Sequence, residues 1–426
     1  MVKKLYYCLL FLFCFEEVLS YTNLPLSTLK YLVSFSLVLI LIKRGYKMPK
    51  TRILGINIFI ILLIIALFRA FPNILNNDFE GIIVWKNYLW FPVLLFLYSN
   101  MQKSSNIQIN EYLQKFADIM CLYIITNITL YYVHIPILIT NPHRYWGRLT
   151  VGYPTIDVIL IGFAIAVVFF AEHKWNNKAF LLRALILCIG MLMQASGTGL
   201  VFITILIILM FFYLNGIFIK QPLEFIKRKR IYFITLLFII IASATFSLAI
   251  FRAQNEELYN AMTDQIENRI NILLGMEEES AITVNTMDIR EERLKRAESK
   301  FLTNGDKKLF GIGYGFINMK EDKTNKILTE DQITMNKVTI GILGNYIYIL
   351  ILISLLISIL KKFKYTSNIY IYISTWFFLL LSSFTSNCLL SFGPISLWCM
   401  VYSFSLNDYN HKIILGNRKN IRNCTT

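Results

Sequence analysis

Charged residues are scarce in this chain. Aspartate, glutamate, lysine and arginine make up 16% of its 426 residues, whereas about a quarter of a soluble globular protein is charged. This shortage argues against an ordinary soluble domain.

Metal ligands and cofactor motifs are missing as well. The four histidines and seven cysteines are scattered, and no two cysteines have C-x-x-C spacing, so the pattern of a zinc site is absent. The glycine-rich run Phe310-Gly-Ile-Gly-Tyr-Gly-Phe316 lacks the lysine of a nucleotide-binding P-loop. We therefore expect no metal and no other cofactor.

Apolar residues are abundant instead, and they come in long blocks. They make up 56% of the sequence, and the mean hydropathy is +0.56. Because about 20 helical residues cross the hydrocarbon core, the blocks predict an all-α polytopic membrane protein with about twelve transmembrane helices. We place these spans near 5–20, 25–42, 53–69, 86–99, 117–137, 155–171, 180–196, 199–215, 231–250, 338–360, 367–385 and 388–406.

The first block also fits a cleaved signal peptide, because two lysines precede it. We interpret it as a retained span, since it lacks a clear small-residue cleavage site and carries Glu16 and Glu17 near its outer end.

The distribution of lysine and arginine predicts the orientation. Retained cytoplasmic loops are enriched in these residues, and 24 of the 42 fall in one set of loops. The short loops of the opposite set hold only Lys30, Arg69, Lys86, Arg144 and Arg148. Both termini are therefore expected in the cytoplasm. The net charge of +16 then reflects cytoplasmic loops and does not indicate a nucleic-acid partner.

One long outer loop, residues 251–337, differs from the rest of the chain. It holds 16 of the 26 acidic residues and 13 basic ones. Apolar positions from Leu258 to Leu273 recur every three to four residues, as in an amphipathic helix. Asp288 and Glu291 resemble the capping box of a second helix. The chain thus divides into a bundle of nine spans (1–250), this loop with short helices, and three spans with a cytoplasmic tail (338–426).

Candidate binding residues gather on the outer side. Arg144 and Arg148 stand four residues apart beside His143, just before a span, and Arg290 and Arg293 share one face of the second loop helix. Guanidinium groups bind phosphate oxygens in a bidentate manner. Interfacial anchoring explains the first pair equally well, and simple solvation explains the second.

Three carboxylates are further candidates. Asp157 lies about one turn into a predicted span, where an acidic residue is functional by default, although it could simply pair with Arg148 or Arg144. Glu330 and Asp331 stand just before the chain re-enters the membrane, and they fit solvated loop acids as well. A site on this side has no access to nucleotide sugars, whereas a lipid-linked pyrophosphate donor brings its own leaving group and anchor.

Three stretches resemble a known family. They are Arg148-Leu-Thr-Val-Gly-Tyr-Pro154, Ala195-Ser-Gly-Thr-Gly-Leu-Val201, and Arg290 through Gly315 followed by Glu330 and Gly341-Ile-Leu-Gly344. With the layout of the spans, they resemble the O-antigen polymerase (Wzy-type) and O-antigen ligase superfamily of bacterial inner membranes. Gly197 stands where the family's turn has arginine.

The resemblance implies a GT-C-like membrane glycosyltransferase of lipopolysaccharide biosynthesis. Such an enzyme moves a growing glycan from undecaprenyl pyrophosphate onto one more lipid-linked repeat unit, beside flippase and chain-length-regulator partners. The four outer arginines of the two pairs would stabilise the departing pyrophosphate. Glu330, with His143 and Asp331 as alternatives, would take the proton of the acceptor hydroxyl.

Two rival functions remain. The ligase shares the donor but usually has a histidine in the large loop, and no histidine occurs between residues 251 and 337, which favours the polymerase. A lipid-oligosaccharide flippase is the rival from another class. It should show two related halves, and the sequence has no such symmetry.

Overall fold

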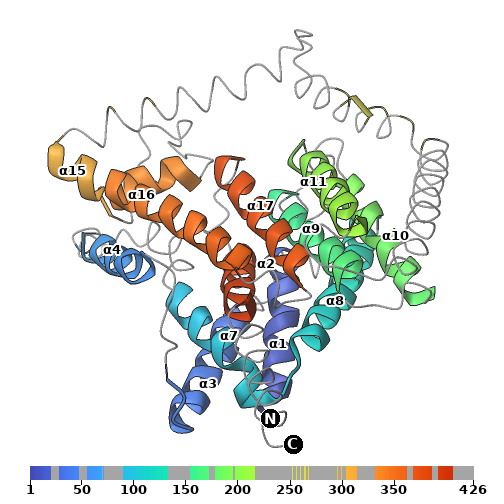
Figure 1. The fold of residues 1–426 in the computed structure, drawn as a ribbon, viewed down its shortest axis with the longest axis horizontal. Helices are drawn as coiled ribbons and strands as arrows, with labels where there is room; N and C mark the ends of the chain where they lie inside the picture. The colour runs from blue at the N-terminus through green and yellow to red at the C-terminus, as the bar shows by residue number, and fades with distance from the viewer. Residues whose placement is uncertain are drawn as a thin grey trace, which may run out of the picture.

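The computed structural model describes residues 1–20, 28–47, 55–69, 71, 90–132, 154–171, 178–194, 197–215, 304–313, 332–361, 368–385 and 392–405, with eight single positions between 252 and 299. These ranges are built from α-helices and contain no strand (Figure 1). The predicted all-α class is therefore confirmed for the part of the chain described.

The helices are α1 (Val2–Cys14), α2 (Glu16–Ser20), α3 (Leu29–Lys43), α4 (Ile56–Arg69), α7 (Phe91–Ser105), α8 (Ile109–Tyr132), α9 (Pro154–Phe170), α10 (Lys178–Met193), α11 (Gly197–Leu214), α15 (Gly305–Phe310), α16 (Gln332–Lys361) and α17 (Ile369–Thr385). One more helix covers residues 392–405.

Most predicted spans coincide with a helix, but some ends differ. Helix α7 continues to Ser105, and α8 begins at Ile109. Both helices extend through polar turns beyond their apolar blocks, because hydropathy marks the apolar length of a helix and not its hydrogen-bonded length. The predicted span near 231–250 lies outside the residues described. Of the two predicted helices of the long loop, only single positions are described, and these are helical: residues 260, 263, 264 and 267 in the first and residues 295 and 299 in the second.

By length and composition, one described helix, Gln332–Leu360, could cross a membrane. Five shorter apolar helices have 10–17 residues: Ile56–Arg69, Ile156–Phe170, Ala179–Met193, Thr198–Leu214 and Ile369–Phe384.

Helix α16 is broken at Gly341, whose φ of 77° is not helical. Its first part, residues 332–340, includes the predicted span start at 338. Its second part, 342–361, is about 30 Å long at roughly 1.5 Å per residue.

Helix α9 lies at the centre of the bundle. It packs against α8, α10, α11 and α17, and every side chain from Ile156 to Ala171 is buried. A helix that is apolar all round is expected in such a position. Helix α17 lies between α9 and α16 (Figure 1). Close packing at Gly162 joins α9 to α11 and α17, where the rings of Phe202 and Phe378 stack 4.2 Å apart.

Helices α3 and α4 present apolar side chains outward. Large side chains recur every three to four residues along one exposed face of each helix: Leu32, Phe35, Leu39 and Ile42 in α3, and Ile58, Ile61, Ile65 and Phe68 in α4. Contiguous exposed apolar surface of this kind marks contact with a membrane or with another protein.

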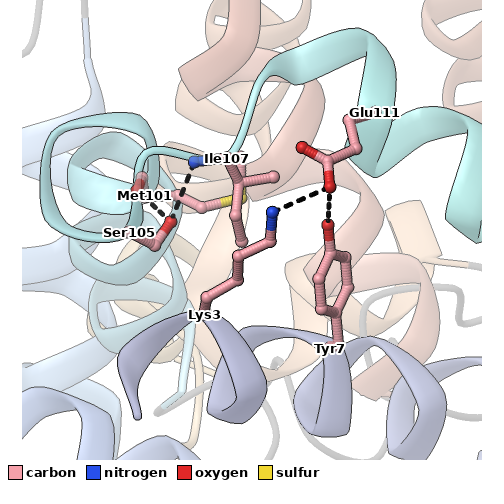
Figure 2. A network of polar contacts seen from close by, with 6 residues as sticks. All are labelled: Lys3, Tyr7, Met101, Ser105, Ile107 and Glu111. Carbon is pink, nitrogen blue, oxygen red and sulfur yellow. Dashed lines mark hydrogen bonds and ion pairs between the residues drawn. The ribbon is translucent and has the colours of Figure 1, made fainter.

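A polar network fastens the start of α1 to the junction of α7 and α8 (Figure 2). Oε1 of Glu111 accepts hydrogen bonds from Lys3 Nζ at 2.9 Å and from the Tyr7 hydroxyl at 2.6 Å. The hydrogen bond from Tyr7, and to a lesser extent the one from Lys3, holds the pKa of Glu111 below its ordinary value. Beside them, Ser105 Oγ accepts from the amide of Ile107 at 3.4 Å. The Ser105–Ile107 hydrogen bond closes the turn between α7 and α8, and the two bonds to Glu111 fasten α1 to the start of α8.

Candidate functional site

Of the eight candidate residues predicted from the sequence, the structure describes Asp157. The other seven lie outside the described residues: His143, Arg144, Arg148, Arg290, Arg293, Glu330 and Asp331. The predicted convergence of arginines on one pyrophosphate therefore remains a prediction.

Asp157 lies in the first turn of α9 and is fully buried. Its Oδ1 accepts a hydrogen bond from the Tyr123 hydroxyl at 2.6 Å. Asn127 Nδ2 lies 3.5 Å from Oδ2 and donates to the Tyr123 oxygen at 3.3 Å. Both partners come from α8 and stand four residues apart, so one face of α8 supplies the donors for this carboxylate.

A second buried carboxylate lies nearby. Glu16 forms an ion pair with Lys30, and each side chain is only 7% exposed. The Glu16 carboxylate also accepts hydrogen bonds from the amides of Phe392 at 3.2 Å and Gly393 at 2.5 Å. These amides begin the helix 392–405, where a negative charge is favoured. Glu16 thus joins α2, α3 and the C-terminal helix.

The two carboxylates belong to one region. The Phe15 ring packs edge-on against Tyr123 with centroids 5.4 Å apart. A Cβ at Gly393 would meet both Glu16 Oε2 and Leu160 of α9 within 3.4 Å. We call Glu16, Lys30, Tyr123, Asn127 and Asp157 the polar cluster.

A second group of contacts surrounds Arg69, the last residue of α4. Its Nη2 donates to both carboxylate oxygens of Asp306, at 3.0 and 2.9 Å, and its Nη1 donates to the carbonyl of Gly311. The guanidinium also lies over the Phe310 ring, 5.6 Å from its centroid. Three residues of the segment 304–313 are thereby held by one side chain.

Three glycines pack where this segment meets α4 and α16. Gly311, Gly313 and Gly341 have φ of 74°, 85° and 77°, in the left-handed region that suits glycine. A Cβ at Gly311 would lie far inside 3.0 Å of the Thr339 carbonyl, and one at Gly341 would lie as close to Leu309. We call Arg69 and these three glycines the glycine junction.

Backbone hydrogen bonds complete the glycine junction. The amide of Ile312 donates to the carbonyl of Val338 at 2.9 Å, and the amide of Gly313 donates to that of Thr339 at 3.0 Å. The break in α16 makes room for this pairing, since a continuous helix would use both carbonyls internally. The run Phe310-Gly-Ile-Gly therefore docks directly beside Gly341.

The first part of α16 has a polar buried face. Gln332, Asn336 and Thr339 are all buried, and their spacing places them on one side of the helix. Gln332 Nε2 donates to Asn336 Oδ1 at 2.9 Å. This part follows directly in the chain on Glu330 and Asp331, the carboxylates proposed from the sequence.

Glu16, Lys30 and Arg69 are not among the site residues predicted from the sequence. Their position within apolar blocks could have identified these residues, because an ionisable group inside a membrane span is by default expected to be functional. Arg69 carries the same signal at the end of its apolar block.

The side chains in the described ranges could support acid–base and electrostatic chemistry. These ranges hold no group of three or more histidine, cysteine or acidic residues that could bind a metal ion. Because Asp157 is fully buried, it suits holding the start of α9 in place better than direct contact with a large glycan. Comparisons with protein-family models and with curated proteins give no match for this chain.

Proposed function

We propose that this chain is a polytopic inner-membrane glycosyltransferase of the O-antigen polymerase type. It joins undecaprenyl-pyrophosphate-linked repeat units on the periplasmic side of the bacterial inner membrane. Its partners are the lipid-linked glycans, a flippase that delivers them and a chain-length regulator.

The apolar outer faces of α3 and α4 support placement in a membrane. In water, these rows of isoleucine, leucine and phenylalanine would be an unfavourable surface. In a bilayer they meet acyl chains of equal polarity, and helices satisfy their own backbone hydrogen bonds there. Helices α7 and α8 continue through polar turns beyond their apolar blocks, which lengthens them towards the membrane surface.

The observation that carries the functional proposal is the glycine junction. Two parts of the third resembling stretch, residues 311–313 of the long loop and the break at Gly341, lie in contact. This contact supports a loop that folds back onto the membrane bundle. A polymerase needs such a return, since donor and acceptor arrive anchored in the bilayer while their glycans extend outside it.

The polar cluster gives further support. Lys30, in the first turn of α3, and Arg69, at the end of α4, are among the few basic residues that the charge asymmetry assigns to the outer side. In the proposed mechanism, Arg144, Arg148, Arg290 and Arg293 neutralise the leaving pyrophosphate. Glu330 accepts the proton of the attacking hydroxyl, with His143 and Asp331 as the alternatives.

Deletion of the gene, followed by electrophoresis of the host's lipopolysaccharide, tests the proposal. We expect lipid A–core that carries a single repeat unit, and a full ladder after complementation with the wild-type chain. Core without any repeat unit would indicate a ligase. Repeat units that accumulate on the cytoplasmic side would indicate a flippase.

A further inference from the structure

Arg69 makes an unusual set of contacts for an arginine at a helix end. An exposed ion pair contributes little by itself, and the side chain of Asp306 is 67% exposed. The guanidinium, however, also donates to the Gly311 carbonyl and covers the Phe310 ring. A planar fork that serves a carboxylate, a carbonyl and a ring at once is a geometry that lysine cannot reproduce.

The position of these contacts matters as much as their number. Helices α4 and α15 both pack against α16, and all three meet at the glycine junction. A Cβ at Gly313 would lie 2.7 Å from the Ala66 carbonyl and from Arg69 Cβ, so the loop backbone touches α4 directly. Release of this segment from α4 would loosen the hydrogen bonds of Ile312 and Gly313 to the first part of α16.

We propose that Arg69 is a positioning residue, which fastens the segment 304–313 to α4 and thereby holds the first part of α16 in place. The inference rests on the proposed function in one respect: the first part of α16 follows directly on Glu330 and Asp331. In this proposal Arg69 fixes the position of the helix segment that follows Glu330 and Asp331, and it does not itself contact the donor or the acceptor.

Steady-state kinetics of purified variants with a lipid-linked repeat unit separate this role from others. Arg69→Ala should lower kcat about 10-fold with KM close to wild type and normal abundance, and Arg69→Lys should fall between the two. Arg183→Ala is the matched control. Arg183 has the same exposure of 28% and pairs with Asp118 at 2.6 Å. It lies in α10 and Asp118 lies in α8, neither of which is part of the glycine junction, so its loss should leave kcat unchanged.

Chemical rescue gives a readout that a merely stabilising role would not move. In the double variant Arg69→Cys and Asp306→Cys, a short bis-maleimide should restore turnover by tying the two positions together again. A monofunctional maleimide should not restore it, and either reagent should leave the wild-type rate unchanged. A cross-linked protein that stays inactive would overturn the proposal, as would Arg69→Ala with an unchanged kcat. A raised KM at constant kcat would also overturn it, because Arg69 would then contact the donor.

Protease added to the outside of spheroplasts tests the fastening without any enzyme assay. The loop 251–331 should be cleaved faster in Arg69→Ala than in Arg183→Ala. Equal rates would overturn the proposal. If the wild-type chain extends no lipid-linked glycan, the proposed function fails, and the cleavage rates still decide whether Arg69 fastens the loop.

Discussion

Replacing Gly341 by alanine should strongly destabilise the protein. At φ of 77° and ψ of −179°, a conformation essentially restricted to glycine, a residue with a side chain costs about 1–3 kcal/mol. The new methyl group would also lie far inside 3.0 Å of the Leu309 carbonyl, and overpacking of this kind typically costs about 1–3 kcal/mol. Together these effects lower the free energy of unfolding by about 2–6 kcal/mol, a large share of the roughly 5–15 kcal/mol of a typical domain.

Titration of the purified protein from mild detergent into SDS, followed by tryptophan fluorescence, measures this loss. Gly45→Ala is the matched control, because Gly45 has φ of 76° and no atom within 4 Å of a new Cβ. It should therefore lose only about 1–2 kcal/mol. Gly305→Ala, with an ordinary φ and open space around it, should remain close to wild type. Equal losses for Gly341→Ala and Gly45→Ala would refute the close packing at the break in α16.

Two further predictions concern buried and exposed carboxylates. Glu16→Ala should lower the free energy of unfolding by about 3–5 kcal/mol, because it leaves the buried ammonium of Lys30 without its carboxylate. Addition of Lys30→Met should recover much of this loss in the same SDS titration. A double variant no more stable than Glu16→Ala would contradict the role of the ion pair. Because the pKa of Glu111 is lowered in the folded state, its stabilising effect is present above the ordinary carboxylate pKa of about 4.3 and is lost as pH falls through the folded value. The Glu111 side chain is 40% exposed, so the free energy of unfolding of the wild type should exceed that of Glu111→Gln by less than about 1 kcal/mol, and this difference should vanish in acid. In Tyr7→Phe, the loss of stability with falling pH should begin at a higher pH. A difference between wild type and Glu111→Gln that did not change with pH would contradict this explanation.

Much of the helical layout could be predicted from the sequence, because an apolar block is a local signal. The predicted segments near 53–69 and 367–385 correspond closely to α4 and α17. The break at Gly341 could not be predicted in this way. Its cause is the approach of residues 309–313, and a contact between segments this far apart leaves no mark on local periodicity.

The candidate site shows the same division. Asp157 could be predicted as a buried acidic residue, because a carboxylate inside an apolar block needs a partner. The identity of its partners in α8 could not, since Tyr123 and Asn127 look like ordinary interior residues of a span. The hydrogen bonds that Glu16 accepts could not be predicted from the sequence either, because the donor amides of Phe392 and Gly393 lie near the other end of the chain.

Reconstitution of the purified chain in liposomes shows whether the chain alone polymerises lipid-linked repeat units. The vesicles would contain undecaprenyl-pyrophosphate-linked repeat units as the only glycan, with no other protein. We expect a ladder of longer lipid-linked glycans, together with one released undecaprenyl pyrophosphate for each unit added. Repeat units that cross the bilayer without elongation, or that are transferred only when lipid A–core is supplied, would contradict it.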